Sequence, residues 1–201
     1  MKQFARFLAG ACVLAALAVL VYPSAATGGD KELRVGDKAP IFESVDENGK
    51  PWKSSDVVGK KIVVLYFYPA DFTGGCTAQA CGFRDNYETL KSKEVEVVGV
   101  SGDTPKTHQM FKKHHQLPFI LLSDDKGELA KKFGVKVNVK EGTATGIDEQ
   151  GNKVPVIRGA TISRVTIVID KQGNIAAVDS ISKAGEDAKR VAEIVQKLEK
   201  K

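Results

Sequence analysis

An uninterrupted apolar run at residues 62–68 constrains the fold more than any other stretch of this chain. The run reads Ile-Val-Val-Leu-Tyr-Phe-Tyr and ends at Pro69. It has no polar face, and β-branched and aromatic residues of this kind favour a strand. A strand that is apolar on both faces lies inside a sheet that is covered on both sides. The chain must therefore fold as layers around a central sheet.

A helical pattern begins near Cys76, after a turn that contains Gly74 and Gly75. Free N–H groups and aligned peptide dipoles at the start of a helix stabilise a thiolate. The thiolate is the reactive form of cysteine, so Cys76 is a candidate nucleophile. The alternative is that Cys76 is a small buried hydrophobic residue, which is a frequent role of a free cysteine.

Strands and helices alternate along the rest of the chain. A hairpin is expected with its turn at 46–49, followed by a short helical turn at 54–56, and a second hairpin is expected as an insertion within 135–162. Further strands are expected at 95–101, 119–122, 164–169 and 175–180, and helices at 76–91, 104–115, 123–134 and 184–198. This order predicts an α/β domain with a central sheet flanked by helices.

The first 26 residues have the pattern of a secretory signal peptide. Lys2 and Arg6 precede an uncharged apolar stretch at 7–22, and small residues follow it. We expect cleavage after Ala26, a linker at 27–34 and one folded domain at 35–201 in the periplasm or another extracytoplasmic space. The alternative is an uncleaved segment at 7–22 that anchors the protein to a membrane, although a spanning helix usually needs roughly 20 apolar residues.

The chain has three cysteines, and Cys12 would leave with the signal peptide. The remaining pair, Cys76 and Cys81, could form a disulfide in an oxidising compartment. Removal of Lys2 and Arg6 lowers the net charge from +5 to +3. The other positive residues are interspersed with acids, so no nucleic-acid partner is expected.

Two overlapping motifs resemble a known family. Pro69-x-x-x-Thr73-x-x-Cys76 resembles the active-site signature of the peroxiredoxins, and Cys76-x-x-x-x-Cys81 with the following Gly-Phe-Arg-Asp is similar to the Q type, the bacterioferritin comigratory protein branch. The similarity continues through 98–103, 117–124 and 164–170, and covers residue 35 to the C-terminus. It implies a thioredoxin-like fold with a central mixed sheet.

The sequence departs from the Q-type pattern at two positions. Gly74 stands where that type usually has proline, and Gln79 stands where it usually has glutamate. Residues 71–73, Asp-Phe-Thr, are more similar to the typical two-cysteine branch. That branch needs a resolving cysteine near the C-terminus, but no cysteine follows Cys81, which favours Cys81 or an external thiol.

The resemblance implies a thiol-dependent peroxidase that needs no metal or other cofactor. Cys76 would attack the peroxide O–O bond and become a sulfenic acid. The Thr73 hydroxyl would lie between the thiolate and the peroxide, Arg164 would supply a fixed positive charge, and Pro69 would shield the site. Cys81 would resolve the sulfenic acid as a disulfide, which a thioredoxin-like protein would reduce. The protein is expected to be a monomer or a weak dimer.

Helix geometry sets a condition on the Cys76–Cys81 disulfide. Five residues along a regular helix separate the two Cα atoms by roughly 8 to 9 Å. A disulfide needs less than about 7 Å. The helix must therefore unwind locally before the two sulfur atoms can bond.

The same residues also allow other interpretations. Arg164 could be an ordinary surface charge at the start of a strand. His108, His114 and His115 could form a metal site with the cysteines, as in copper-carrying chaperones of the same fold, but they lie on a separate expected helix. A dithiol oxidoreductase would carry Cys-x-x-Cys, whereas here four residues separate the cysteines. A non-catalytic binding module would be expected to lose Thr73, Cys76 or Arg164.

Overall fold

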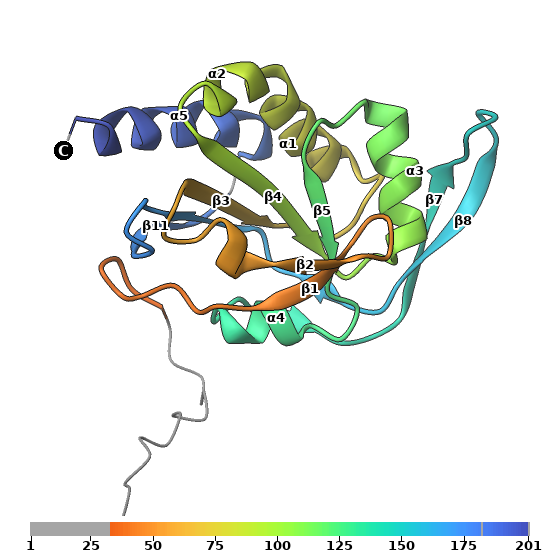
Figure 1. Cartoon of the computed structure of the whole chain (residues 1–201). Coiled ribbons are helices and arrows are strands. Elements are labelled where there is room, and N and C mark those ends of the chain that lie inside the picture. Colours follow the sequence, from red (N-terminus) through yellow and green to blue (C-terminus); the bar gives the residue numbers. More distant parts are fainter. Residues whose placement is uncertain (1–32, 182, 201) are drawn as a thin grey trace, which may run out of the picture.

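The computed structural model describes residues 33–181 and 183–200. The expected signal peptide and most of the expected linker lie outside these residues. The described part contains a seven-stranded sheet in the order β11-β10-β3-β4-β5-β1-β2 (Figure 1). Its strands are β1 (Glu43–Asp46), β2 (Pro51–Lys53), β3 (Ile62–Phe67), β4 (Val95–Ser101), β5 (Ile120–Ser123), β10 (Val165–Ile169) and β11 (Ile175–Ser180).

The sheet is mixed, as expected, and β3 lies inside it, between β10 and β4. Strands β3, β4 and β5 are parallel, whereas β10 pairs antiparallel with β3 and β1 pairs antiparallel with β5. Every residue of β3 is buried. The two edges of the sheet are hairpin strands, β2 and β11.

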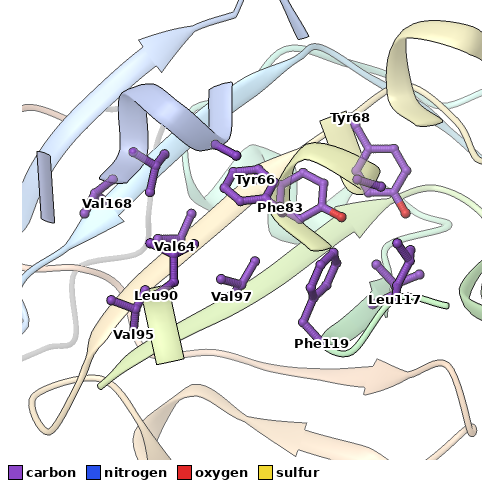
Figure 2. Close-up of a cluster of buried hydrophobic side chains, with 14 of the residues drawn as sticks. Val64, Tyr66, Tyr68, Phe83, Leu90, Val95, Val97, Leu117, Phe119 and Val168 are labelled. Atoms are coloured by element: carbon purple, nitrogen blue, oxygen red, sulfur yellow. The ribbon is translucent and has the colours of Figure 1, made fainter. Parts of the chain in front are cut away.

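Helices cover both faces of the sheet (Figure 1). One face carries α1 (Gly74–Asp85), α2 (Tyr87–Lys91), α3 (Pro105–His115) and α5 (Asp187–Leu198), and the other carries α4 (Glu128–Lys132). Alternate residues of β3 point to opposite faces of the sheet. Val64 and Tyr66 pack against the four-helix face, and Val63 and Leu65 pack against the face that carries α4. Figure 2 shows the first cluster, in which Tyr66 stacks on Phe83 of α1 with ring centroids 4.8 Å apart.

Most expected elements are confirmed, and the differences have local causes. The helix after Cys76 begins at Gly74 and is interrupted at Asn86, whose side-chain amide donates to the Gly82 carbonyl at 2.9 Å. The same carbonyl accepts the Asn86 N–H at the longer distance of 3.3 Å, so the side chain competes with the backbone hydrogen bond where the segment divides into two helices. The expected helix at 123–134 is shorter, because residues 124–127 form a turn before α4. Asp124 caps α4 by accepting from the N–H groups of Leu129 and Ala130.

The last expected helix, at 184–198, begins as a 3-10 turn, η2 (Ala184–Glu186), and continues as α5. The short helical turn after the first hairpin is present as η1 (Ser54–Asp56). No helix in the described part of the chain is long and apolar enough to cross a membrane.

The inserted hairpin is also confirmed. It consists of β7 (Gly142–Ile147) and β8 (Lys153–Arg158), and it stands beside α3 (Figure 1). Two short strands at its base, β6 (Val137–Asn138) and β9 (Thr161–Ile162), pair with each other. After the insertion the chain continues into β10, which pairs with β3.

Candidate active site

The loop between β3 and α1 is fastened by a buried polar network. The Tyr68 hydroxyl donates to Asp71 Oδ1 at 2.8 Å, and His108 Nδ1 lies 2.7 Å from Asp71 Oδ2. The Asp71 N–H donates to Asp103 Oδ2 at 2.9 Å, and His108 Nε2 lies 3.2 Å from the Leu122 carbonyl. Both nitrogens of the His108 ring thus face acceptors. This arrangement suits an imidazolium that donates twice.

The network shifts the pKa values of His108 and Asp103, and burial followed by the charge of Asp71 raises that of Tyr68. Burial by itself lowers the pKa of His108, but the charge of Asp71 and the hydrogen bond to it outweigh this effect, so the pKa of His108 is raised. Burial, followed by the charge of Asp71, raises the pKa of Asp103 to about 6. The paired Asp71 and His108 side chains are both completely buried. They anchor the loop that leads to the first turn of α1.

Phe72 follows Asp71 in a strained conformation. Its φ of 57° lies in the left-handed region, which is unusual for a bulky residue. Its ring packs edge-on against Phe111 of α3 with centroids 5.2 Å apart. Gly146 of the inserted hairpin faces the same ring, and a Cβ atom there would lie 3.1 Å from it. Contacts from α3 and β7 therefore hold the strained residue in place.

Cys76 is the third residue of α1 and is 1% exposed. Arg164, immediately before β10, donates from Nη2 to the Cys76 sulfur at 3.1 Å. The neighbouring Gly74 and Gly75 are exposed, and a Cβ atom on Gly75 would lie 3.3 Å from Arg164 Nη2. A glycine at position 75 thus leaves room for the guanidinium. The structure brings Cys76 and Arg164 together, and Arg164 is not a free surface charge.

Thr73 and Pro69 lie close to Cys76 in sequence, but no described hydrogen bond joins either residue to Cys76 or Arg164. Thr73 precedes α1 as its N-cap, and its hydroxyl donates to the Ala70 carbonyl at 2.9 Å. A hydroxyl that donates one bond retains lone pairs that can accept another. Pro69 is half-buried and lies two residues after the end of β3. Both residues shape the loop in front of Cys76.

Cys81 lies further along the same helix and faces α3. Its sulfur is 4.0 Å from His115 Nδ1, and both Cys76 and Cys81 are free thiols. Burial, then the charges of His114 and Arg84, lowers the pKa of His115. Because α1 is continuous across the two cysteines, their Cα atoms are roughly 8 to 9 Å apart. The geometry described is that of a reduced, fully folded site.

The three histidines do not converge. His108 is buried against Asp71, His114 is exposed, and His115 lies beside Cys81. Across residues 33–181 and 183–200, no group of three or more His, Cys, Asp or Glu side chains is arranged to hold a metal ion.

Two residues at the site were not assigned a role from the sequence. Arg164 donates from Nη1 to Gln79 Oε1 at 2.5 Å, and Gln79 donates from Nε2 to Asp187 Oδ2 at 2.7 Å. Gln79 follows Cys76 by three residues, a spacing that places both on one side of a helix, so its proximity could have been anticipated. Asp187 is more than a hundred positions away, and no local pattern indicated it.

A family model described as the AhpC/TSA family matches residues 35–178. The putative peroxiredoxin Bcp of Coxiella burnetii is 42% identical over 146 residues, which are 73% of this chain and 87% of that protein. Peroxiredoxin Bcp of Bacillus subtilis is 41% identical over 71% of this chain and 82% of its own length. The chloroplastic peroxiredoxin Q of Populus jackii is 42% identical over 71% of this chain, but the match spans only 58% of that longer protein.

Solved structures agree with the fold. Peroxidoxin BcpB from Mycobacterium tuberculosis has a TM-score of 0.67 at 29% identity, covering 83% of this chain and 99% of its own. Peroxiredoxin Q from Xanthomonas campestris has a TM-score of 0.63 at 23% identity, covering 78% and 90%, and supports the fold alone. The mixed sheet with its flanking helices is thus a thioredoxin-like fold, and the chain belongs to the AhpC/TSA family as a peroxiredoxin of the Q (Bcp) type.

Proposed function

We propose that the chain reduces hydrogen peroxide and small organic hydroperoxides, with Cys76 as the residue that attacks the peroxide. The observation that carries this proposal is the 3.1 Å contact between Arg164 Nη2 and the Cys76 sulfur in the first turn of α1. A cation and a helix N-terminus both favour the thiolate. The thiolate attacks one peroxide oxygen, the O–O bond breaks, and Cys76 becomes a sulfenic acid while hydroxide or alkoxide departs.

Arg164 and Thr73 form different hydrogen bonds with the bound peroxide in this proposal. The guanidinium offers further N–H groups to the departing oxygen, where negative charge develops. The Thr73 hydroxyl donates to the Ala70 carbonyl and retains lone pairs for the O–H group of a bound peroxide. Pro69 has no N–H group, so the backbone there does not compete for the same oxygen atoms.

Cys81 resolves the sulfenic acid in this proposal. Its thiol condenses with the Cys76 sulfenic acid, which forms the disulfide and releases water. The first turns of α1 must unwind for this step, and the chain supplies Gly74, Gly75 and Gly82 there, where glycine weakens a helix. A thioredoxin-like dithiol protein then reduces the disulfide by thiol exchange.

The N-terminal pattern supports a proposal about location. Residues 1–26 act as a signal peptide, and the domain at 35–201 works outside the cytoplasm, as a monomer or a weak dimer. Intact mass of the protein recovered from cell fractions tests this: cleavage after Ala26 removes Cys12 with the segment. Recovery of the full-length chain in the membrane fraction would instead support an anchor at 7–22.

Thiol titration and intact mass before and after one equivalent of peroxide test the catalytic proposal. In the full chain, titratable thiols should fall from three to one, with a loss of about 2 Da for the new disulfide. Cys76→Ser should abolish peroxide consumption, since a serine hydroxyl is scarcely ionised at neutral pH. Peroxide consumption at the normal rate by Cys76→Ser would refute the assignment of Cys76.

A further inference from the structure

A chain of hydrogen bonds connects the Cys76 sulfur to the C-terminal helix. Arg164 donates from Nη2 to Cys76 at 3.1 Å and from Nη1 to Gln79 Oε1 at 2.5 Å. The other end of the Gln79 amide donates from Nε2 to Asp187 Oδ2 at 2.7 Å. Gln79 is fully buried and Asp187 is 1% exposed. The connection is therefore shielded from water along its inner half.

The chemistry of Asp187 decides which way the Gln79 amide points. A carboxylate only accepts hydrogen bonds, so the amide must turn its NH₂ group toward Asp187. The amide oxygen is then left facing Arg164, which only donates. If the amide were reversed, an NH₂ group would face the guanidinium, and a second acceptor would face the carboxylate. Because the guanidinium is planar, the Nη1 bond to Gln79 also directs Nη2 at Cys76.

Asp187 is itself held in place by two further donors. The Thr166 hydroxyl donates to Oδ2 at 2.7 Å, and Arg190 donates from Nη2 to Oδ1 at 2.9 Å. Asp187 is the first residue of α5, and the chain just before it packs closely on α1. A Cβ atom on Gly82 of α1 would lie 3.6 Å from the Gly185 carbonyl oxygen. An acid that only stabilised the start of α5 through the helix dipole would need none of these partners.

We propose that Asp187 is a positioning residue for the peroxide step: it orients the Gln79 amide, and Gln79 in turn aims Arg164 at Cys76. The proposal rests on the proposed role of Cys76. In this proposal α5 helps to position the active-site residues, even though it comes after Cys76, Cys81 and Arg164 in the sequence.

Asp187→Ala tests the proposal by removing the acceptor. The second-order rate of Cys76 oxidation by hydrogen peroxide should fall about tenfold, the effect of losing one charge-assisted hydrogen bond. The pH profile of Cys76 alkylation, followed on the Cys76 peptide by mass spectrometry, should move to higher pH, because the guanidinium is no longer held against the sulfur. A merely structural role for Asp187 would not move this profile.

Asp179→Asn is the matched control. Arg190 donates from Nη1 to Asp179 and from Nη2 to Asp187, and Asp179 makes no described contact with Gln79. This variant removes the same charge from the same neighbourhood, so its oxidation rate and alkylation profile should match those of the unaltered protein. A tenfold loss in both variants would show a general electrostatic effect and would overturn the proposal.

An exchange of the two side chains provides a test that does not depend on Asp187→Ala folding. Gln79→Glu alone places a second carboxylate at the 2.7 Å contact and should slow oxidation. Adding Asp187→Asn restores one carboxylate and one amide at this contact. The glutamate at position 79 can then accept from both Arg164 and the asparagine at position 187. The double variant should recover most of the normal rate.

The outcomes separate this inference from the proposed function. Activity in Cys76→Ser would overturn the function itself. An inactive Cys76→Ser together with a normal rate and alkylation profile for Asp187→Ala would overturn only the role of Asp187. The same conclusion would follow if the double variant were no faster than Gln79→Glu alone.

Discussion

Oxidation to a Cys76–Cys81 disulfide should unfold the start of α1 while the sheet stays intact. In the reduced structure both cysteines lie on one continuous helix, with Cα atoms roughly 8 to 9 Å apart. The limit for a disulfide is about 7 Å, so the helix must open between them. Formation of the disulfide therefore removes helical hydrogen bonds that the reduced form makes.

The size of the effect follows from the bonds that must break. Unwinding breaks three side-chain hydrogen bonds: the two that Arg164 donates, to Cys76 and to Gln79, and the one that Gln79 donates to Asp187. Each contributes about 1 kcal/mol, so local opening becomes easier by about 3 kcal/mol. Since 1.4 kcal/mol corresponds to a factor of ten, amide exchange in the first two turns of α1 should accelerate about 100-fold.

Hydrogen exchange with mass spectrometry measures this directly on peptides that cover 73–84. Peptides from β4 serve as the internal reference, because this central strand should exchange equally slowly in both forms. Cys81→Ser treated with peroxide is the matched control, since it can form the sulfenic acid but not the disulfide. Equal exchange of 73–84 in the reduced and disulfide forms would refute the reasoning.

Four other changes give distinct outcomes. Arg164→Met should slow Cys76 oxidation by at least tenfold and shift alkylation of Cys76 to higher pH, because the cation 3.1 Å from the sulfur is lost; an unchanged pH profile would place Arg164 outside the reaction. Cys81→Ser should keep a fast first reaction with peroxide, fail to turn over with a dithiol reductase and accumulate sulfinic acid at Cys76; normal turnover would make this a one-cysteine enzyme. Tyr66→Phe should leave the free energy of unfolding unchanged or raise it by up to about 1 kcal/mol, because the buried Tyr66 hydroxyl has no hydrogen-bond partner in the described structure; urea denaturation measures this. Asp71→Asn should lower the free energy of unfolding by about 3 to 5 kcal/mol through loss of the buried pair with His108. Because the pKa of His108 is raised in the folded state, its contribution to stability is full below about pH 6.5 and declines as the pH rises through the folded value. Denaturation at a series of pH values should show that decline in the unaltered protein and not in Asp71→Asn.

Local sequence determined most helices and strands and indicated which cysteine is the candidate nucleophile. The apolar run that became β3 predicted a strand inside the sheet, and the proline and glycines after it predicted a turn and a helix start near Cys76, two residues from the observed start at Gly74. Caps and turns act within a few residues and are therefore predictable from local sequence. At the start of α3, for example, the Thr104 side chain accepts from the Thr107 N–H, and Pro105 is the first helical residue. Two predicted helices were too long: at Asn86 a side chain shares the Gly82 carbonyl with the backbone, and residues 124–127 form a turn before α4.

Only the tertiary structure decided which distant residues meet the cysteines. Arg164 had two open interpretations in the sequence, and the pairing of β10 with β3 brought it to Cys76. The contacts of His115 with Cys81, His108 with Asp71, and Asp187 with Gln79 depend on how α3 and α5 pack against α1 and the active-site loop. Periodicity and capping act over a few residues, whereas side-chain hydrogen bonds depend on three-dimensional proximity. For that reason the sequence alone indicated Cys76 as a candidate nucleophile, and only the folded chain shows which distant residues contact it.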